Sequence, residues 1–124
     1  MNFDRPEIDF PGETPPKDLE ITDVHVGDGT EAVAGAKVTV HYVGVAFSTG
    51  EEFDASWNRG KPFQFNLGEG QVIAGWDQGV AGMKVGGRRK LVIPPHLGYG
   101  DRGAGRAIKG GETLIFVVDL ISVD

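Results

Sequence analysis

The 124-residue sequence contains no cysteine, which excludes disulfide scaffolds and thiol chemistry. It also has no run of apolar residues long enough to span a membrane. Its first residues, MNFDRPEIDF, lack the basic segment followed by a long apolar stretch that marks a secretory signal. Together these absences predict a soluble, cytoplasmic protein.

Basic charge is scarce as well. The formal net charge is −6, and residues 1–36 hold nine acidic and two basic side chains, whereas residues 37–124 hold nine and ten. A nucleic-acid-binding protein normally presents a concentrated basic surface. The one dense basic cluster, Arg88 to Lys90, lies on an expected strand, and we interpret it as a solvated edge. No nucleic-acid or membrane partner is therefore predicted.

Residues that bind metals are also few. The three histidines, His25, His41 and His96, offer no pair at the spacing of metal ligands. We expect all three at surface positions. The sequence thus predicts neither a metal nor another cofactor.

Proline is concentrated at the start of the chain. Four of the seven prolines lie within residues 1–17 among acidic residues, a composition that cannot form a helix and offers few side chains to bury. We therefore predict an extended, acidic, proline-rich leader over residues 1–17. Residues 18–124 are of a length that suits one domain with one core.

Alternating apolar residues predict an antiparallel sheet in that domain. The alternation covers residues 19–26, 37–47, 63–67, 89–93 and 113–123. A segment with six glycines, residues 96–112, separates the last two of these strands. Loops of this length in compact domains tend to be functional.

The stretch VIAGWDQGVAGM, residues 72–83, has the helical rather than the strand period. Its apolar side chains share one sector of a helix, although each internal glycine costs about 1 kcal/mol relative to alanine. Gly75, Gly79 and Gly82 form a strip without side chains beside that sector, which would let a sheet come close. We predict an α+β fold in which one short helix lies on a curved antiparallel sheet and points Trp76 into the concavity.

Aromatic residues gather on the predicted inward faces. For any single phenylalanine in a strand, simple core filling is the favoured interpretation. As a group they fit a cup with a polar rim better, because both tyrosine hydroxyls need partners and a carboxylate, Asp54, directly follows Phe53. The group comprises Tyr42, Phe53, Phe63, Phe65, Trp76, Tyr99 and Phe116.

Three segments make the sequence recognisable: VTVHYVG, the run from GEEFDAS through VIAGWDQGV to GYG, and TLIFVVDLISV. In this order and spacing they closely resemble the FKBP-type peptidyl-prolyl cis/trans isomerases, the macrolide-binding immunophilins. The resemblance covers residues 18–124. It implies an antiparallel sheet of five to six strands wrapped around one short helix, with the active cleft between them.

The resemblance also implies roles for individual residues. Trp76 would form the floor of the pocket, and Asp54, Tyr99 and the backbone N–H of Ile73 would supply polar contacts to the substrate. Arg59 would support and orient the Asp54 carboxylate. The remaining substrate-binding walls would be Tyr42, Phe53, Phe63, Phe65, Val72, Ile108 and Phe116.

The implied activity is isomerisation of X–Pro bonds in polypeptides without a covalent intermediate or a metal. Tacrolimus- and rapamycin-type macrolides would be further ligands, and we expect a monomer. The sequence departs from the family in the loop after Tyr99, where bulky or ring residues are replaced by Ala104, Gly105, Ala107, Lys109 and Gly110. A non-catalytic module that binds proline segments or macrolides is therefore an alternative.

Overall fold

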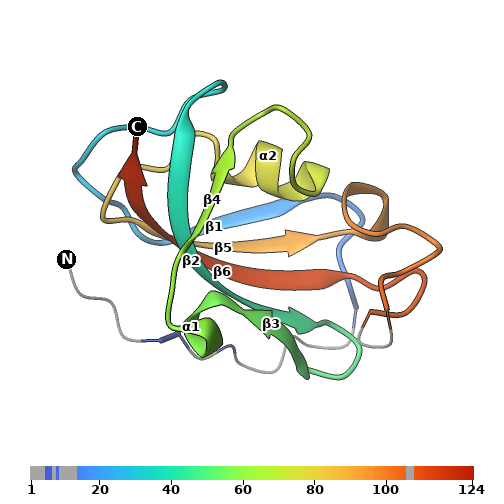
Figure 1. Cartoon of the computed structure of the whole chain (residues 1–124). Coiled ribbons are helices and arrows are strands. Elements are labelled where there is room, and N and C mark those ends of the chain that lie inside the picture. The colour runs from blue at the N-terminus through green and yellow to red at the C-terminus, as the bar shows by residue number, and fades with distance from the viewer. Residues whose placement is uncertain (1–4, 7, 9–13, 106–107) are drawn as a thin grey trace.

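The computed structural model of the chain describes residues 5, 6, 8, 14–105 and 108–124. Figure 1 shows a curved antiparallel sheet with one helix, α2, lying across one face. The α+β fold predicted from the sequence is therefore confirmed. Its elements are β1 (Glu20–His25), β2 (Lys37–Ala46), β3 (Glu52–Ala55), α1 (Ser56–Arg59), β4 (Phe63–Asn66), α2 (Ala74–Val80), β5 (Arg88–Ile93), a 3-10 turn (Pro95–Leu97) and β6 (Leu114–Val123).

Strand β2 is the centre of the sheet. The strand order is β1-β5-β6-β2-β3, and β4 pairs with β2 as well. The first half of β2 pairs with β4, from Lys37 opposite Asn66 to Val40 opposite Phe63. Its second half pairs with β3, from Val43 opposite Ala55 to Val45 opposite Glu52. One long strand thus brings the aromatic residues of three neighbours to a common side.

The main core lies between α2 and the concave side of the sheet. Alternation along the strands sends every second side chain to this side, as the sequence predicts. The residues with no exposed surface here are Val38, Val40, Leu67, Val80, Leu91, Ile93, Leu114, Val118 and Leu120. The intervening residues Val45, Phe47, Val92 and Ile115 form a second, smaller cluster.

Helix α2 is shorter than the predicted segment 72–83 and contacts the sheet through glycine. A Cβ placed on Gly75 would lie 2.5 Å from Ile93, and one on Gly79 would lie 2.6 Å from Leu91, both side chains of β5. The two glycines are therefore packing positions, as expected, but they meet side chains rather than the sheet backbone. Gly82 does not belong to this close contact: it follows the helix with φ of 91°, and a Cβ there would lie 3.9 Å from Nη1 of Arg89.

The basic cluster on β5 corrects the sequence interpretation, because β5 is not a solvated edge. Arg88 is paired with the buried carboxylate of Asp119 through Nε at 2.6 Å. Arg89 donates from Nη1 to the carbonyl oxygens of Gly79 and Ala81, at 2.9 and 3.1 Å. A guanidinium at these last carbonyls satisfies helix acceptors that have no partner within the helix. Arg89 thus fixes the end of α2 to the sheet.

The described part of the leader lies against the domain. Pro6 is buried, and Ile8 packs against the cluster formed by Val45, Phe47, Val92 and Ile115. Other leader residues, including Phe3 and Phe10, lie outside the described residues. Within the described ranges, no helix combines the length and the apolar character that crossing a bilayer requires.

Candidate active site

An open cleft of about 200 Å³ lies between α2 and the aromatic residues of the sheet. Strands β2, β3, β4 and β6 each contribute to its wall, and so do the residues that precede α2 and follow the 3-10 turn. The lining residues are Tyr42, Phe53, Asp54, Phe63, Gln71, Val72, Ile73, Trp76, Tyr99 and Phe116. The structure therefore brings together nine of the residues singled out from the sequence.

Trp76 is the hub of the aromatic wall. Its ring lies 4.9 Å from that of Tyr42 at 79° and 5.2 Å from that of Phe116 at 86°. Edge-to-face pairs at such distances are favourable beyond the area they bury. Residue Trp76 is 4% exposed, whereas Phe63 and Tyr99 are 37% and 41% exposed. Trp76 is thus a fixed floor, and Phe63 and Tyr99 form an accessible rim.

Phe65 and Ile108 do not line the cleft. Phe65 is 3% exposed and packs behind Trp76, with the two ring centroids 5.6 Å apart. Ile108 is 6% exposed and belongs to the main core. Their contact with a ligand would have to be indirect, through the position of the residues in front of them.

A glycine in β2 shapes the opposite wall. A Cβ on Gly44 would lie 2.7 Å from both Phe53 and Phe116, so these rings rest directly on the strand backbone. The two rings also meet edge to face, with centroids 5.5 Å apart. A side chain at position 44 would therefore displace these two rings, both of which line the cleft.

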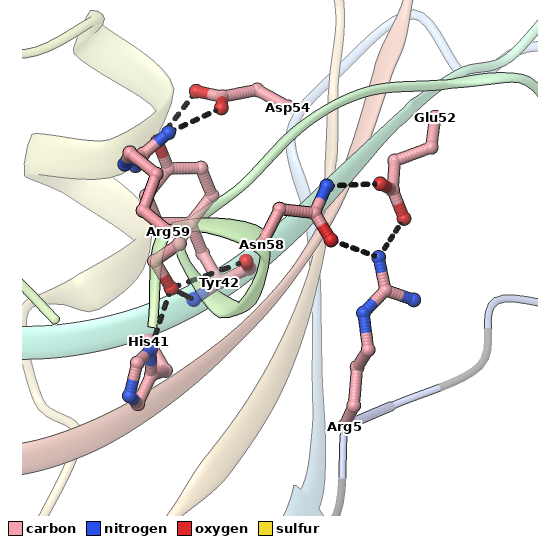
Figure 2. A network of polar contacts seen from close by, with 8 residues as sticks. Arg5, His41, Tyr42, Glu52, Asp54, Asn58 and Arg59 are labelled. Carbon is pink, nitrogen blue, oxygen red and sulfur yellow. Dashed lines mark hydrogen bonds and ion pairs between the residues drawn. The ribbon is translucent and has the colours of Figure 1, made fainter. Parts of the chain in front are cut away.

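Asp54 is held by two side chains (Figure 2). The Tyr42 hydroxyl donates to Oδ2 at 2.5 Å, and Arg59 donates from Nη1 to Oδ1 at 2.7 Å. Arg59 also donates from Nη2 to the Tyr42 hydroxyl at 2.8 Å, which closes a ring of three side chains. Arg59 itself is not among the lining residues, so its place is that of a support for the acid.

The electrostatics of this ring keep the carboxylate ionised. Burial raises the pKa of Asp54, but the hydrogen bonds from Tyr42 and Arg59 and the charge of Arg59 outweigh it, so the pKa lies below its usual value. For Tyr42, burial and the neighbouring Asp54 raise the pKa of the phenol. At neutral pH the cleft therefore carries a fixed negative charge beside a neutral phenol.

Local structure places both members of the ion pair. Asp54 lies opposite Gly44 in the β2–β3 ladder. One turn of helix, α1, then brings Arg59 back over Asp54, and Gly60 ends that turn with φ of 68°. The sequence analysis does not predict α1, because four residues are too few to show a helical period.

Below this turn, a second polar cluster corrects the expectation that His41 is a surface residue. The Ser56 hydroxyl is fully buried and accepts from the backbone N–H of Tyr42 at 2.7 Å. Nδ1 of His41 lies 2.7 Å from the same hydroxyl, and the imidazole stacks on Trp57 with centroids 4.3 Å apart. Burial lowers the pKa of His41 more than the nearby Asp119 charge raises it.

The two groups expected to donate hydrogen bonds to the substrate are not used within the described residues. Neither the backbone N–H of Ile73 nor the hydroxyl of Tyr99 donates to an acceptor in the part of the chain that the structure describes. Ile73 instead accepts through its carbonyl from Trp76 N–H at 2.9 Å, at the start of α2. Both donors are therefore free to bind a carbonyl oxygen of a ligand.

Gln71 is a lining residue that the sequence analysis misses. Its Oε1 accepts from the backbone N–H of Asn66 at 2.8 Å, which ties the loop before α2 to the end of β4. No pattern in the sequence marks it, since a glutamine in a glycine-rich turn is ordinary. In the loop after Tyr99, a pair of backbone hydrogen bonds joins Ala104 and Ile108, whereas Ala107 lies outside the described residues.

Fold and cleft together define a class of protein: a single domain in which an open aromatic cleft lies between a curved sheet and helix α2, with one ionised carboxylate at its edge. Comparison with known proteins agrees. The family of FKBP-type peptidyl-prolyl cis-trans isomerases matches residues 29–121. The chain belongs to this family.

Individual relatives resemble the chain over most of its length. An FK506-binding protein of Streptomyces anulatus is 70% identical over 99% of this chain and 100% of its own. An FK506-binding protein of Neisseria meningitidis serogroup A is 52% identical over 85% of this chain and 95% of its own. The crystal structure of AtFKBP13 superposes with a TM-score of 0.80 and 43% identity, covering 89% of this chain and 96% of that one.

Proposed function

We propose that the chain accelerates cis/trans isomerisation of X–Pro bonds in polypeptides by binding the prolyl amide in this cleft. The observation that carries the proposal is the open aromatic cleft floored by Trp76, with the ionised Asp54 held at its edge by Tyr42 and Arg59. Membership in a family of peptidyl-prolyl isomerases supports it.

The reaction is a rotation, so no bond to the protein is needed. Resonance opposes rotation of a peptide bond by about 18–20 kcal/mol, and X–Pro bonds therefore isomerise over tens to hundreds of seconds. Twisting the bond by about 90° removes the resonance and much of the negative charge on the carbonyl oxygen. An apolar site consequently disfavours the polar planar amide more than the twisted amide, and this difference lowers the barrier.

The residues of the cleft have distinct parts in this proposal. The pyrrolidine ring stacks over Trp76 between Tyr42 and Phe116. The free N–H of Ile73 and the hydroxyl of Tyr99 hold substrate carbonyls, which fixes one side of the bond while the other turns. The Asp54 carboxylate, ionised and immobile, acts on the twisted amide through its charge.

An NMR exchange measurement on a short Phe-Pro peptide tests the proposal. The unvaried protein is expected to raise the exchange rate between cis and trans peptide. Asp54→Asn removes the charge and should slow turnover more than it weakens peptide binding. Glu51→Gln is the matched control, because it removes a carboxylate nearby whose side chain makes no hydrogen bond within the described residues.

Trp76 tests whether binding and turnover depend on the same aromatic floor. Trp76→Leu keeps an apolar side chain but removes the flat floor, so both peptide binding and catalysed exchange should fall. If the wild-type protein binds the peptide saturably but does not change its cis/trans exchange rate, catalysis is refuted. The alternative, a non-catalytic binding module, would then remain. Equal turnover in Asp54→Asn and the unvaried protein would refute the role given to that acid.

We further propose that the same cleft binds tacrolimus- or rapamycin-type macrolides, an extension from relatives named FK506-binding proteins. A tacrolimus-type macrolide should then inhibit the exchange competitively with peptide, and Trp76→Leu should weaken its binding. Macrolide binding that leaves peptide exchange undisturbed would contradict a shared site. The cytoplasmic location and the monomeric state stay predictions from the sequence.

A further inference from the structure

We infer that Arg5, in the leader, is a positioning residue for the cleft, because it joins the two elements that carry Asp54 and Arg59. This inference rests on the proposed function for its effect on turnover. Its structural part, the link between the leader and the cleft edge, can be tested independently of any activity.

The contact is a ring of three side chains (Figure 2). Arg5 donates from Nη2 to Oε1 of Glu52, the first residue of β3. The same nitrogen lies 3.4 Å from Oδ1 of Asn58 in α1, and Asn58 donates from Nδ2 to Oε2 of Glu52 at 2.9 Å. We call this ring the clasp. It fastens the start of β3 to the middle of α1.

The clasp encloses the part of the chain that needs support. Asp54 lies between its two anchor points, and Arg59 directly follows Asn58. Strand β3 has four residues, lies at the edge of the sheet and pairs with β2 across a register shift between Gly44 and Val45. An edge strand this short has few ladder hydrogen bonds to hold it, so side-chain links from outside determine how firmly the Asp54 carboxylate is placed.

Arg5 is itself anchored. Pro6, the next residue, is buried, and Ile8 packs on Val45, Phe47, Val92 and Ile115 on the side of the sheet away from α2. These two contacts fix the backbone near Arg5, so less conformational entropy is lost when the guanidinium binds Glu52. Without such an anchor, an exposed ion pair contributes little.

Charge supports the same assignment. Burial raises the pKa of Glu52, but the hydrogen bonds from Asn58 and Arg5 outweigh it, so the pKa lies below its usual value. Glu52 is two residues from Asp54, and the two carboxylates repel each other. Loss of Arg5 would leave Glu52 with one neutral partner and an unbalanced repulsion at the base of Asp54.

The experiment compares Arg5→Ala with Lys17→Ala in the full chain. Lys17 is the matched control, because it is the other basic residue of the leader and has no ion pair within the described residues. Amide hydrogen exchange and peptide isomerisation are measured on both variants. Further variants complete the set: Arg5→Lys, Glu52→Gln, and the double variant that combines Arg5→Ala with Glu52→Gln.

Arg5→Ala is expected to speed amide exchange over residues 53–59 by about two- to fivefold, with β5 and β6 unchanged, the range of an anchored surface ion pair. The turnover number for the Phe-Pro peptide should fall by a similar factor with little change in KM, because substrate contacts remain. Arg5→Lys should recover part of the protection from amide exchange and part of the turnover number. With Glu52→Gln present, Arg5→Ala should add less than it does alone, because both act on one contact.

The inference is wrong if Arg5→Ala and Lys17→Ala show the same amide exchange over residues 53–59 and the same turnover number. A uniform rise in exchange across the sheet also overturns it, since this would mean general destabilisation. If the unvaried protein fails to isomerise the peptide, the proposed function fails, whereas faster exchange confined to residues 53–59 in Arg5→Ala still supports the clasp.

Discussion

Replacing Gly79 with alanine should both destabilise the protein and impair the cleft. A new Cβ at this position would lie 2.6 and 2.7 Å from the two terminal methyl groups of Leu91, which is fully buried. Ordinary contacts between carbon atoms are about 3.5–4.0 Å. Either Leu91 or α2 must therefore move by about 1 Å.

Two opposed effects set the size of the change. Alanine favours a helix over glycine by about 1 kcal/mol, and overpacking a core costs about 1–3 kcal/mol. The free energy of unfolding of Gly79→Ala should therefore fall by about 1 kcal/mol. Trp76 is one turn earlier on the same helix, so a shift of α2 moves the floor of the cleft. A displacement of this size can lower kcat/KM by about 10- to 100-fold.

Urea unfolding and the peptide exchange measurement test this prediction. Gln78→Ala is the control, because Gln78 is exposed on the same helix and its replacement changes helix propensity by only a few tenths of a kcal/mol. Leu91→Ala, which alone should cost about 2–5 kcal/mol, leaves space that the new methyl group of Gly79→Ala can fill. The double variant should consequently be more stable than the sum of the single effects indicates.

A gain in stability of about 1 kcal/mol for Gly79→Ala, with an unchanged isomerisation rate, would refute the reasoning. Helix propensity alone would then account for the result. Gly75 and Gly79 would then only weaken α2, and the close packing of α2 on β5 would not determine the position of Trp76.

Two further predictions concern charged groups. Asp119→Asn leaves the Arg88 guanidinium, 16% exposed, without its buried anionic partner, so urea unfolding should show a loss of about 3 kcal/mol. Asp23→Asn should cost less than about 1 kcal/mol, because the Asp23 carboxylate is 41% exposed and its partner Arg89 keeps the carbonyl oxygens of Gly79 and Ala81 as acceptors. Equal losses in the two variants would contradict this argument. Because the folded-state pKa of His41 lies below the usual 6.5, the stability from its neutral form is complete above that pH and declines as the pH falls below it. The lowered pKa values of Glu52 and Asp54 add a second decline, which begins below about pH 4.5 for Glu52 and below about pH 3.8 for Asp54. Unfolding free energies measured from pH 8 to pH 3 should show both steps, and His41→Gln should remove the first; an unaltered first step would exclude His41 as its cause.

Short-range patterns in the sequence predict much of this fold. Period-two alternation places Val38, Val40 and Tyr42 on one side of β2, and the structure has all three in the main core. The period of α2 likewise orients Trp76 towards the sheet. Such patterns depend on neighbours a few residues apart, so the folded chain hardly alters them.

The sequence does not reveal how deeply each predicted side chain lies. Phe63 and Phe65 share a strand face, yet one is 37% exposed at the rim and the other 3% exposed behind Trp76. Alternation gives the side of the strand, whereas depth depends on how the sheet curves and on where α2 lies. The same limit applies to Ile108, which the family resemblance places at the pocket and the structure places in the core.

Contacts between distant segments are the other gap. Arg88 and Asp119 are 31 residues apart, and Arg5 and Glu52 are 47 apart. In the sequence, Arg88 and Arg89 are recognisable only as part of a short run of basic residues. Arg5 is recognisable only as a basic residue in an acidic leader. The partner of Arg88 is fixed by the pairing of β5 with β6, and that of Arg5 by where the leader lies against the sheet; no local pattern specifies either.

The position of β6 between β5 and β2 has a consequence for how the protein is made. Until Leu114–Val123 are in place, β1 and β5 on one side and β2, β3 and β4 on the other share no ladder. The residues before β6 therefore leave the ribosome before the two half-sheets can unite, and closing them brings together segments far apart in sequence, which slows folding. During that interval the side chains that will line the aromatic cleft are exposed, and exposed apolar surface of this kind makes a partly folded chain prone to aggregation.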